Sequence, residues 1–380
     1  MARRAIGKGG GVNSVVMATL ATLRRNVKGE KFLPAFNPEA RDGFVRRITG
    51  EVAKTFDALR MDATVIEDPN DSNFIYICDA AQIDGVVPDF PLPAEARVGV
   101  VLEGRPENAM THVRAGSGLA VTCGVEDHIR MQCLAPGLDP EAVWARLDKL
   151  DTAFNGRVEY AFRRDIGYLT ANPELAGNAL DFAAYVLPLG LELQDASEET
   201  MRDMRRLGCV FEPTCSIAQG FSGLCMVSFD CGGSRSEDQC AAAFRRAIVE
   251  LAERELDARA ELAEEGEAFL LDAFSRDLAI LRNAYAIAAD ESISKLWSVR
   301  VGIDMGYVSG IKAQQVEQAI CAMKSPGIAL GATENPKECW EMLNSLYDTD
   351  ADTREETEDY IDTLRASYLR WALRGVKIIQ

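Results

Sequence analysis

One short segment constrains the fold of this chain more than any other: residues 121–133, which read VTCGVEDHIRMQC. Apolar and polar residues alternate on both sides of its centre, which is typical of a β-strand. The centre itself holds two carboxylates, an imidazole and a guanidinium, contributed by Glu126, Asp127, His128 and Arg130. Such groups are costly to bury unless they satisfy one another. The segment is therefore either a solvated β-turn with a salt bridge or part of a functional site.

Composition excludes several classes of function. The chain has 380 residues, enough for two domains, and a net charge of −18, which disfavours binding to nucleic acid or to a membrane surface. The apolar run near the N-terminus is too short to span a membrane. Ten cysteines without a CxxC pair, and two histidines in all, give no pattern for a metal site. The scattered thiols indicate a reducing compartment, so we expect a cytoplasmic protein.

Two motifs in the middle of the chain resemble those of a known family. VEDHIRMQ resembles Asn-Glu-Glu-Asp-His-Leu-Arg-Ile-Gln of the ATP:guanidino phosphotransferases, the phosphagen kinase superfamily. FRRDIGYLTANPELAGNAL resembles their Leu-Gly-Tyr-Leu-Thr-Ala-Cys-Pro segment, and SVRVGIDMGYV resembles a motif of their carboxy-terminal helical region. Within the superfamily the chain is most similar to the bacterial protein arginine kinases, of which it is identified as a divergent member. The chain has no P-loop motif GxxxxGK[ST].

The order of these motifs, with a strand-rich middle and a helical end, predicts an α+β fold. We expect a mostly antiparallel sheet flanked by helices in a phosphotransferase-like domain at residues 12–262. An all-helical domain at residues 265–380 should follow. In protein arginine kinases the corresponding helical domain mediates dimerisation and regulation, so the resemblance implies a homodimer.

The resemblance assigns roles to six residues. Glu126 takes the position of the catalytic base that orients and deprotonates the substrate guanidinium, and Asp127 is the second catalytic residue, which supports Glu126 as its partner. Arg130 and Arg25 stand at positions of ATP-binding arginines. In the helical domain Asp362 and Arg365 match part of a phosphoarginine-binding motif, whose first arginine is Ile361 here.

Other family arginines that bind ATP phosphates are replaced. The corresponding positions align with Leu20, Thr22, Phe211 and Asp181. An apolar side chain cannot replace a guanidinium fork, and a carboxylate repels phosphate. Arginines elsewhere in the sequence are candidates for compensation, namely Arg163, Arg164 and Arg235.

Two classes of function follow. The first is a pseudokinase or binding scaffold that has lost ATP. The alternative is an active protein arginine kinase, which needs ATP and Mg²⁺ and transfers the γ-phosphate to arginine side chains of protein substrates. A zinc-binding activator and the Clp unfoldase machinery are partners that the family implies. A redox role for the cysteines between residues 209 and 240 is a third reading, although no sequence pattern there lowers a thiol pKa.

Overall fold

The structure is a computed structural model that describes residues 11–35, 37–66, 99–103, 118–213, 223–231, 235–323, 328 and 351–379. The chain forms two compact units. The strand-rich unit comprises Ala18–Ala184 and Ser228–Ile248, and the helical unit comprises Met1–Met17, Tyr185–Val227 and Val249–Gln380. The predicted boundary near residue 263 stays a prediction.

Within the described residues, eight strands form one sheet in the order β2-β3-β4-β5-β1-β8-β10-β9. Their bounds are β1 Val16–Arg25, β2 Ala63–Ile66, β3 Gly99–Glu103, β4 Gly118–Cys123, β5 Ile129–Pro136, β8 Leu180–Val186, β9 Cys209–Pro213 and β10 Cys225–Phe229. The pairs β2–β3, β3–β4, β4–β5 and β5–β1 are antiparallel. The sheet and its helices confirm the predicted α+β fold. The apolar run NFIYICD at residues 73–79 predicts a further strand, and it lies outside the described residues.

Strand β1 occupies the middle of this sheet, between β5 and β8. Its side chains are buried on both faces, apart from the half-buried Met17 and Arg24. A strand buried on both faces has to be apolar nearly throughout. The run VMATLATL meets that requirement, and the two arginines come only at its end.

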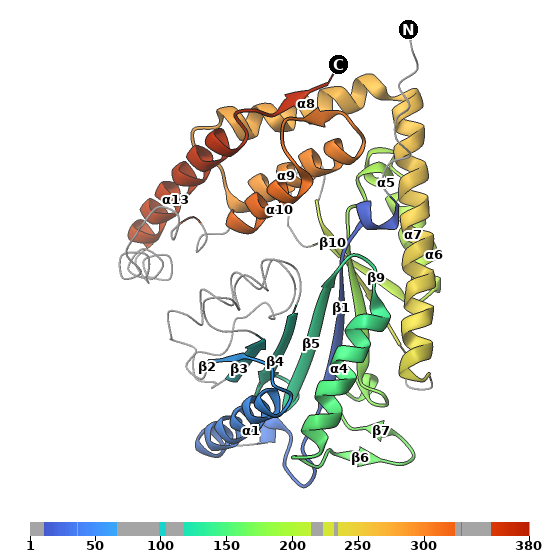
Figure 1. The fold of residues 1–380 in the computed structure, drawn as a ribbon, viewed down its shortest axis with the longest axis vertical. Helices are drawn as coiled ribbons and strands as arrows, with labels where there is room; N and C mark the ends of the chain where they lie inside the picture. Colours follow the sequence, from blue (N-terminus) through green and yellow to red (C-terminus); the bar gives the residue numbers. More distant parts are fainter. Residues whose placement is uncertain are drawn as a thin grey trace. The chain divides into compact units, whose positions relative to one another are not determined.

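Two helices of the strand-rich unit pack against each other and against the sheet (Figure 1). Helix α1 (Pro38–Ala58) packs on β3, and α4 (Pro140–Asn155) packs on β5. Both begin with a proline that follows a capping side chain. Asn37 accepts a hydrogen bond from Ala40 N at 2.8 Å, and Asp139 accepts one from Ala142 N at 3.3 Å. These capping bonds satisfy amide groups that the first helical turn leaves free, so the sequence sets both helix starts.

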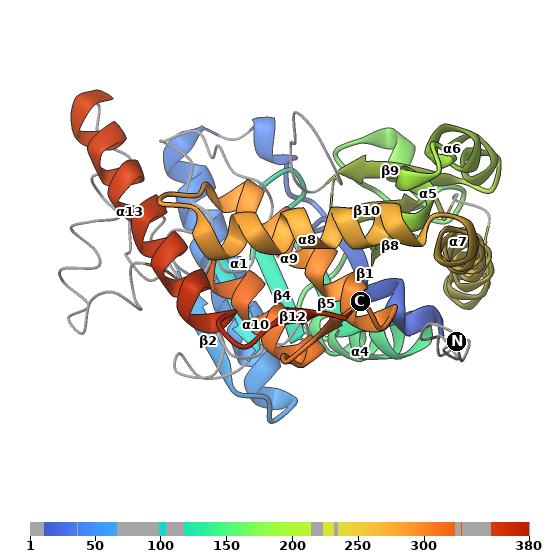
Figure 2. The same ribbon diagram turned by 90° about the horizontal axis from the view of Figure 1, so that it is seen from above.

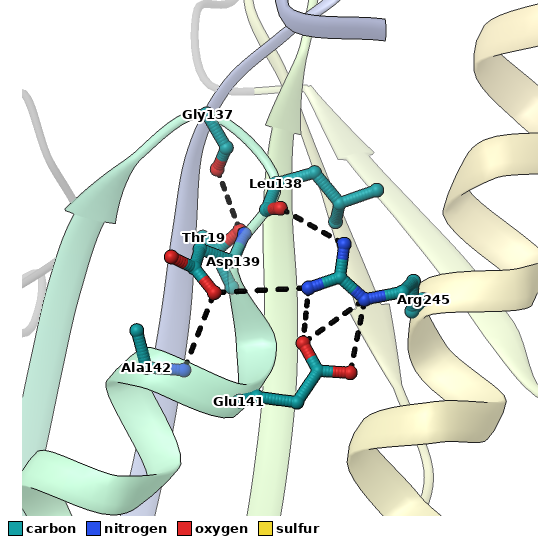
Figure 3. Close-up of polar contacts among 7 residues, drawn as sticks. All are labelled: Thr19, Gly137, Leu138, Asp139, Glu141, Ala142 and Arg245. Atoms are coloured by element: carbon teal, nitrogen blue, oxygen red, sulfur yellow. Dashed lines mark hydrogen bonds and ion pairs between the residues drawn. The ribbon is translucent and has the colours of Figure 1, made fainter.

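The start of α4 is also tied to helix α7 (Glu237–Glu265) through Arg245 (Figure 3). The Nε of Arg245 donates to both carboxylate oxygens of Glu141 at 2.9 Å, and its Nη1 donates to Leu138 O at 3.3 Å. Thr19 Oγ1 of β1 donates to Gly137 O at 2.7 Å and accepts from Asp139 N at 3.1 Å. These contacts link the turn before α4 to both β1 and α7.

The helical unit contains α5 Leu189–Leu193, α6 Ser197–Arg206, α8 Glu267–Asn283, α9 Ala289–Asp304, α10 Ala313–Ala322 and α13 Ala351–Ala372. Helix α8 packs against α9 and α13, and α9 packs against α10 (Figure 2). The short strands β11 (Val308–Ser309) and β12 (Lys377–Ile378) pair beside them. No helix in the described part of the chain is both long enough and apolar enough to cross a membrane.

Candidate functional site

Residues 124–128 form the turn that joins β4 to β5, and we call it the acidic turn. Gly124 opens it with a φ of +92°, a conformation that favours glycine. The turn closes with a hydrogen bond from Gly124 N to His128 O at 3.1 Å. Arg41 of α1 donates through Nη2 to Gly124 O at 2.7 Å. The turn therefore has a defined conformation, with the side chain of Glu126 exposed to solvent.

Asp127 anchors the acidic turn to two neighbouring segments. The carboxylate is buried, with an exposed fraction of 4%, and its Oδ1 accepts from Asn26 Nδ2 and from Ala171 N, both at 2.6 Å. The Asn26 side chain also accepts from His128 N at 2.9 Å. Through Oδ1, Asp127 therefore holds the acidic turn against the segments of Asn26 and Ala171, and Glu126 is left as the accessible carboxylate of the turn.

His128 is a neutral imidazole with both nitrogens in use. Its Nδ1 accepts from Val27 N at 2.9 Å, so the ring proton is on Nε2, which lies 2.8 Å from Lys31 O. Burial lowers the pKa of His128, because the charged form loses its solvation. This histidine supports the turn and keeps no nitrogen available for catalysis.

Arg25 is enclosed by partners within the strand-rich unit. Its exposed fraction is 1%, and Nε and Nη2 donate to the two carboxylate oxygens of Asp151 at 3.1 and 2.9 Å. Its Nη1 donates to Arg24 O at 2.9 Å and Asn178 O at 3.1 Å, and the guanidinium lies 3.5 Å from the ring centroid of Tyr168. A phosphate could reach these donors only by displacing Asp151. The ATP role of Arg25 stays a prediction that its geometry does not support.

Arg24 and Arg130 lie directly opposite each other in the β1–β5 ladder. Cross-strand neighbours share one face of the sheet, and two like charges there repel each other. Arg24 is neutralised by an ion pair with Asp181 of β8. The sequence analysis assigned an ATP-binding role to Arg25 and overlooked Arg24, the residue before it. The alternation of strand side chains was the available signal, since it sends these two arginines to opposite faces.

Arg130 keeps donors that no described group satisfies. Its Nε and Nη2 are buried and have no hydrogen-bond partner among the described residues. Burial and the charge of Arg24 lower the pKa of Arg130 to about 10, while Glu126 and Asp127 favour its charged form. The side chain is therefore protonated at neutral pH and presents two N–H groups in the fork that binds oxyanions. Of the predicted site residues, Glu126 is the exposed carboxylate and Arg130 is the arginine with unsatisfied donors, so these two are the candidates for chemistry.

The positions that align with the other family arginines hold no cation. Leu20 and Thr22 are buried in β1, and Gln132 donates to Thr22 Oγ1 at 3.4 Å. Phe211 is a half-buried residue of β9. Asp181 is the partner of Arg24. The paired strands β1 and β5 therefore supply two guanidinium groups to this face of the sheet, of which one is neutralised.

The predicted phosphoarginine residues lie in helix α13 of the helical unit. Arg365 is 1% exposed, donates through Nε to Met323 O at 2.6 Å and through Nη1 to Ile287 O at 2.8 Å, and forms an ion pair with Asp362. Ile361, which replaces the first arginine of the motif, is a core residue. Arg365 therefore acts as a cross-link between backbone segments, and the phosphoarginine role stays a prediction.

Metal binding finds no support in this geometry. Among the residues that the structure describes, no three or more His, Cys, Asp or Glu side chains are grouped so that they could hold a metal ion.

Two family models match the chain. Residues 100–207 match the ATP:guanido phosphotransferase C-terminal catalytic domain, and residues 267–333 match the C-terminal domain of protein-arginine kinase McsB. The first match contains the acidic turn, Arg130 and Asp181. The second begins at the first residue of α8 and covers α9 and α10.

Known proteins show the same relationship. Protein-arginine kinase of Bacillus cereus (strain B4264) is 28% identical over 211 residues, covering 55% of this chain and 59% of the relative. That of Halothermothrix orenii is 27% identical, covering 53% and 60%. The matched region thus spans about three-fifths of the length of these relatives.

Solved structures support the fold alone, because their sequence identity is low. The duplicated taurocyamine kinase of Schistosoma mansoni, substrate-free, aligns with a TM-score of 0.51 at 16% identity over 72% of this chain and 39% of that one. Its complex with transition-state analog components gives 0.52 at 16% identity, over 70% and 38%. The family models and the curated relatives confirm the predicted resemblance to the ATP:guanido phosphotransferases and, among them, to the protein-arginine kinases.

Proposed function

We propose that this chain is a protein-arginine-kinase-like phosphotransferase homologue that has lost productive ATP binding and acts as a pseudokinase or binding scaffold. The observation that carries the proposal is the ion pair between Arg24 and Asp181. The carboxylate of Asp181 pairs with the guanidinium of Arg24, which would otherwise be available to a phosphate on this face of the sheet. It also adds a negative charge that repels a nucleotide.

The magnitudes favour this reading. The loss of one preorganised charge-stabilising donor typically costs about 2.7–4 kcal/mol in the transition state. An arginine that stabilises a transferred phosphoryl group is worth about 10³–10⁵ in rate. Such losses are not additive, but three family arginine positions here are neutral and one is acidic. Arg130 by itself cannot restore a site that needs several guanidinium groups around a triphosphate.

The alternative, an active protein arginine kinase, rests on a different observation. Glu126 is exposed and lies close enough to Arg130 to favour its charge, and Nε and Nη2 of Arg130 have no partner in the described part of the chain. In such an enzyme Glu126 would accept the proton from an arginine of the protein substrate, which makes the guanidinium nucleophilic. Arg130 would bind oxygens of the transferred phosphoryl group. ATP with Mg²⁺ would supply that group.

Partners are inferred from the same resemblance. A binding role implies a protein partner, and the helical unit is the candidate for homodimer contacts, a zinc-binding activator or Clp machinery. The charge of −18 disfavours nucleic acid and anionic membranes as partners. A cytoplasmic location fits this set of partners.

The test measures the thermal stability of the purified chain with and without excess Mg·ATP. Ligand at about 100 times Kd stabilises a protein by roughly 2.7 kcal/mol, which is a shift of a few degrees in a chain of this size. We expect no shift for the native chain and a partial shift for Asp181→Asn, which releases Arg24 opposite Arg130 and removes the repelling charge. Asp272→Asn is the matched control, because it removes the same charge from an exposed ion pair with Arg276.

A clear shift with the native chain would contradict the loss of nucleotide binding. In that case the alternative predicts phosphoarginine on protein substrates, detected by mass spectrometry under conditions that preserve the P–N bond. The product should disappear in Glu126→Gln.

A further inference from the structure

Two buried cysteines of the strand-rich unit lie side by side. Cys231 follows β10, and Cys240 is in the first turn of α7; their exposed fractions are 1% and 0%. Their thiols are within hydrogen-bonding reach of each other. Cys240 Sγ also donates to Cys231 O at 3.6 Å and accepts from Asn178 Nδ2 at 3.4 Å. No other pair of described cysteines shows contacts of this kind.

The surroundings of Cys240 differ from those of the other described thiols. Burial raises the pKa of Cys123, Cys133, Cys209 and Cys225 to about 12, as expected for inert core thiols. The pKa of Cys240 is lowered instead, first by the hydrogen bond from Cys231 and also by Asn178 and Arg235. The amide of Asn178 donates to the sulfur of Cys240 and no described side chain does so for Cys231 apart from Cys240, so the surroundings favour the thiolate on Cys240.

We propose that Cys231 and Cys240 are a modification site: a thiol pair that hydroperoxides oxidise to an intramolecular disulfide. The Cys240 thiolate attacks the peroxide O–O bond, takes one oxygen as a sulfenic acid and releases the second as hydroxide or alkoxide. The Cys231 sulfur then attacks the Cys240 sulfur. The S–O bond breaks, the S–S bond forms, and the Cys231 proton leaves in the water that is released. In total, two thiols and one hydroperoxide give a disulfide, water and water or an alcohol.

The pair contacts residues that shape the polar face of the sheet. Asn178, which binds Cys240, accepts through its backbone oxygen from Arg25 Nη1 at 3.1 Å and through Oδ1 from Leu180 N at 3.1 Å. A disulfide sulfur is a weaker acceptor than a thiolate, so oxidation should loosen the Asn178 side chain. The chemistry of the pair itself needs neither nucleotide nor arginine substrate, and it therefore goes beyond the proposed function.

The experiment is disulfide mapping of the native chain. Purified protein is titrated with hydrogen peroxide while circular dichroism confirms that it stays folded. It is then alkylated in denaturant and digested. We expect a cross-linked peptide that contains Cys231 and Cys240, forms at lower peroxide than any other cysteine modification and disappears on reduction with dithiothreitol.

Two serine variants make the result specific. Cys240→Ser should leave Cys231 fully alkylated at the same peroxide dose, whereas Cys209→Ser, a buried thiol without a thiol partner among the described cysteines, should leave the cross-link unchanged. The inference is overturned if both cysteines of the native chain are alkylated at doses that oxidise other thiols. It is equally overturned if the cross-link appears only after the circular dichroism of the folded chain is lost. The mapping of the native chain decides the matter even where a variant does not fold.

Discussion

The strand-rich unit and the helical unit both bury arginines that resemble phosphate ligands, but they leave different groups for a ligand. In the strand-rich unit Arg130 retains two buried N–H groups that have no partner among the described residues. In the helical unit Arg365 uses Nε and Nη1 on backbone carbonyls and on Asp362. An arginine whose donors are satisfied by the protein stabilises the fold, whereas one with unsatisfied donors can bind an anion.

Arg25 shows that this distinction also applies within one unit. It is only one residue from Arg24, and yet its donors are taken up by Asp151, Arg24 O and Asn178 O. A motif identifies the residue type at a position. The number of guanidinium N–H groups that the protein leaves unsatisfied shows which arginines can bind an anion. Substitutions of these arginines should therefore differ in their effects.

The largest effect is expected for Arg25→Met. Asp151 would remain nearly buried without its cation, and breaking such a pair costs about 3–5 kcal/mol of unfolding free energy. Urea unfolding at neutral pH measures the loss. Arg163→Met is the control, because it removes an exposed ion pair and should not shift the unfolding midpoint. A loss below about 1 kcal/mol would show that Arg25 does not stabilise the fold as its buried ion pair implies.

A smaller loss is expected for Arg365→Met in the helical unit. The substitution leaves the carbonyls of Met323 and Ile287 unpaired and leaves Asp362, whose side chain is 28% exposed, without its partner. Hydrogen bonds to a charged group are worth about 1.5–3 kcal/mol, and we expect a loss in that range. If thermal unfolding is unchanged while binding of a phosphoarginine peptide is lost, Arg365 is a ligand-binding residue instead.

The next effect is a pH dependence that arises from His128. Burial lowers its pKa in the folded chain below the ordinary value near 6.5, so the unfolded chain takes up the proton first as the pH falls. Its contribution to stability is therefore complete above about pH 6.5 and is lost as the pH falls below that value. The slope is at most about 1.4 kcal/mol per pH unit.

Urea midpoints between pH 7.5 and 5 should show this dependence in the native chain. The His128→Asn variant should be less stable throughout and should lack that component of the slope. Equal slopes in the two proteins would indicate that His128 is charged in the folded chain.

The smallest effect on stability is expected for Arg130→Met. The substitution removes a buried charge with unsatisfied donors and relieves its repulsion with Arg24, so we expect no loss, or a gain of about 1 kcal/mol. Binding of inorganic phosphate, measured by calorimetry, should weaken at the same time. A loss as large as that of Arg25→Met would remove the contrast between the two arginines.

Features that depend on neighbours along the chain can be predicted from the sequence. Helices α1 and α4 begin at Asn37-Pro38 and Asp139-Pro140, where each capping bond joins residues only three apart in sequence. The alternation in residues 121–133 placed β4 and β5 and identified the acidic turn between them. The order of the motifs was sufficient for the α+β fold and for the family resemblance.

Which charged side chains remain available depends on the packing of segments that are far apart in sequence. The partners of Arg25 lie 126 and 153 residues away in sequence, and that of Arg24 lies 157 residues away. The Cys231–Cys240 pair likewise depends on where β10 ends relative to the start of α7. Such contacts arise when the sheet brings distant strands together, and a local pattern contains no information about them. The sequence therefore determined which groups are present, and the packing of the strands decided which of them are satisfied.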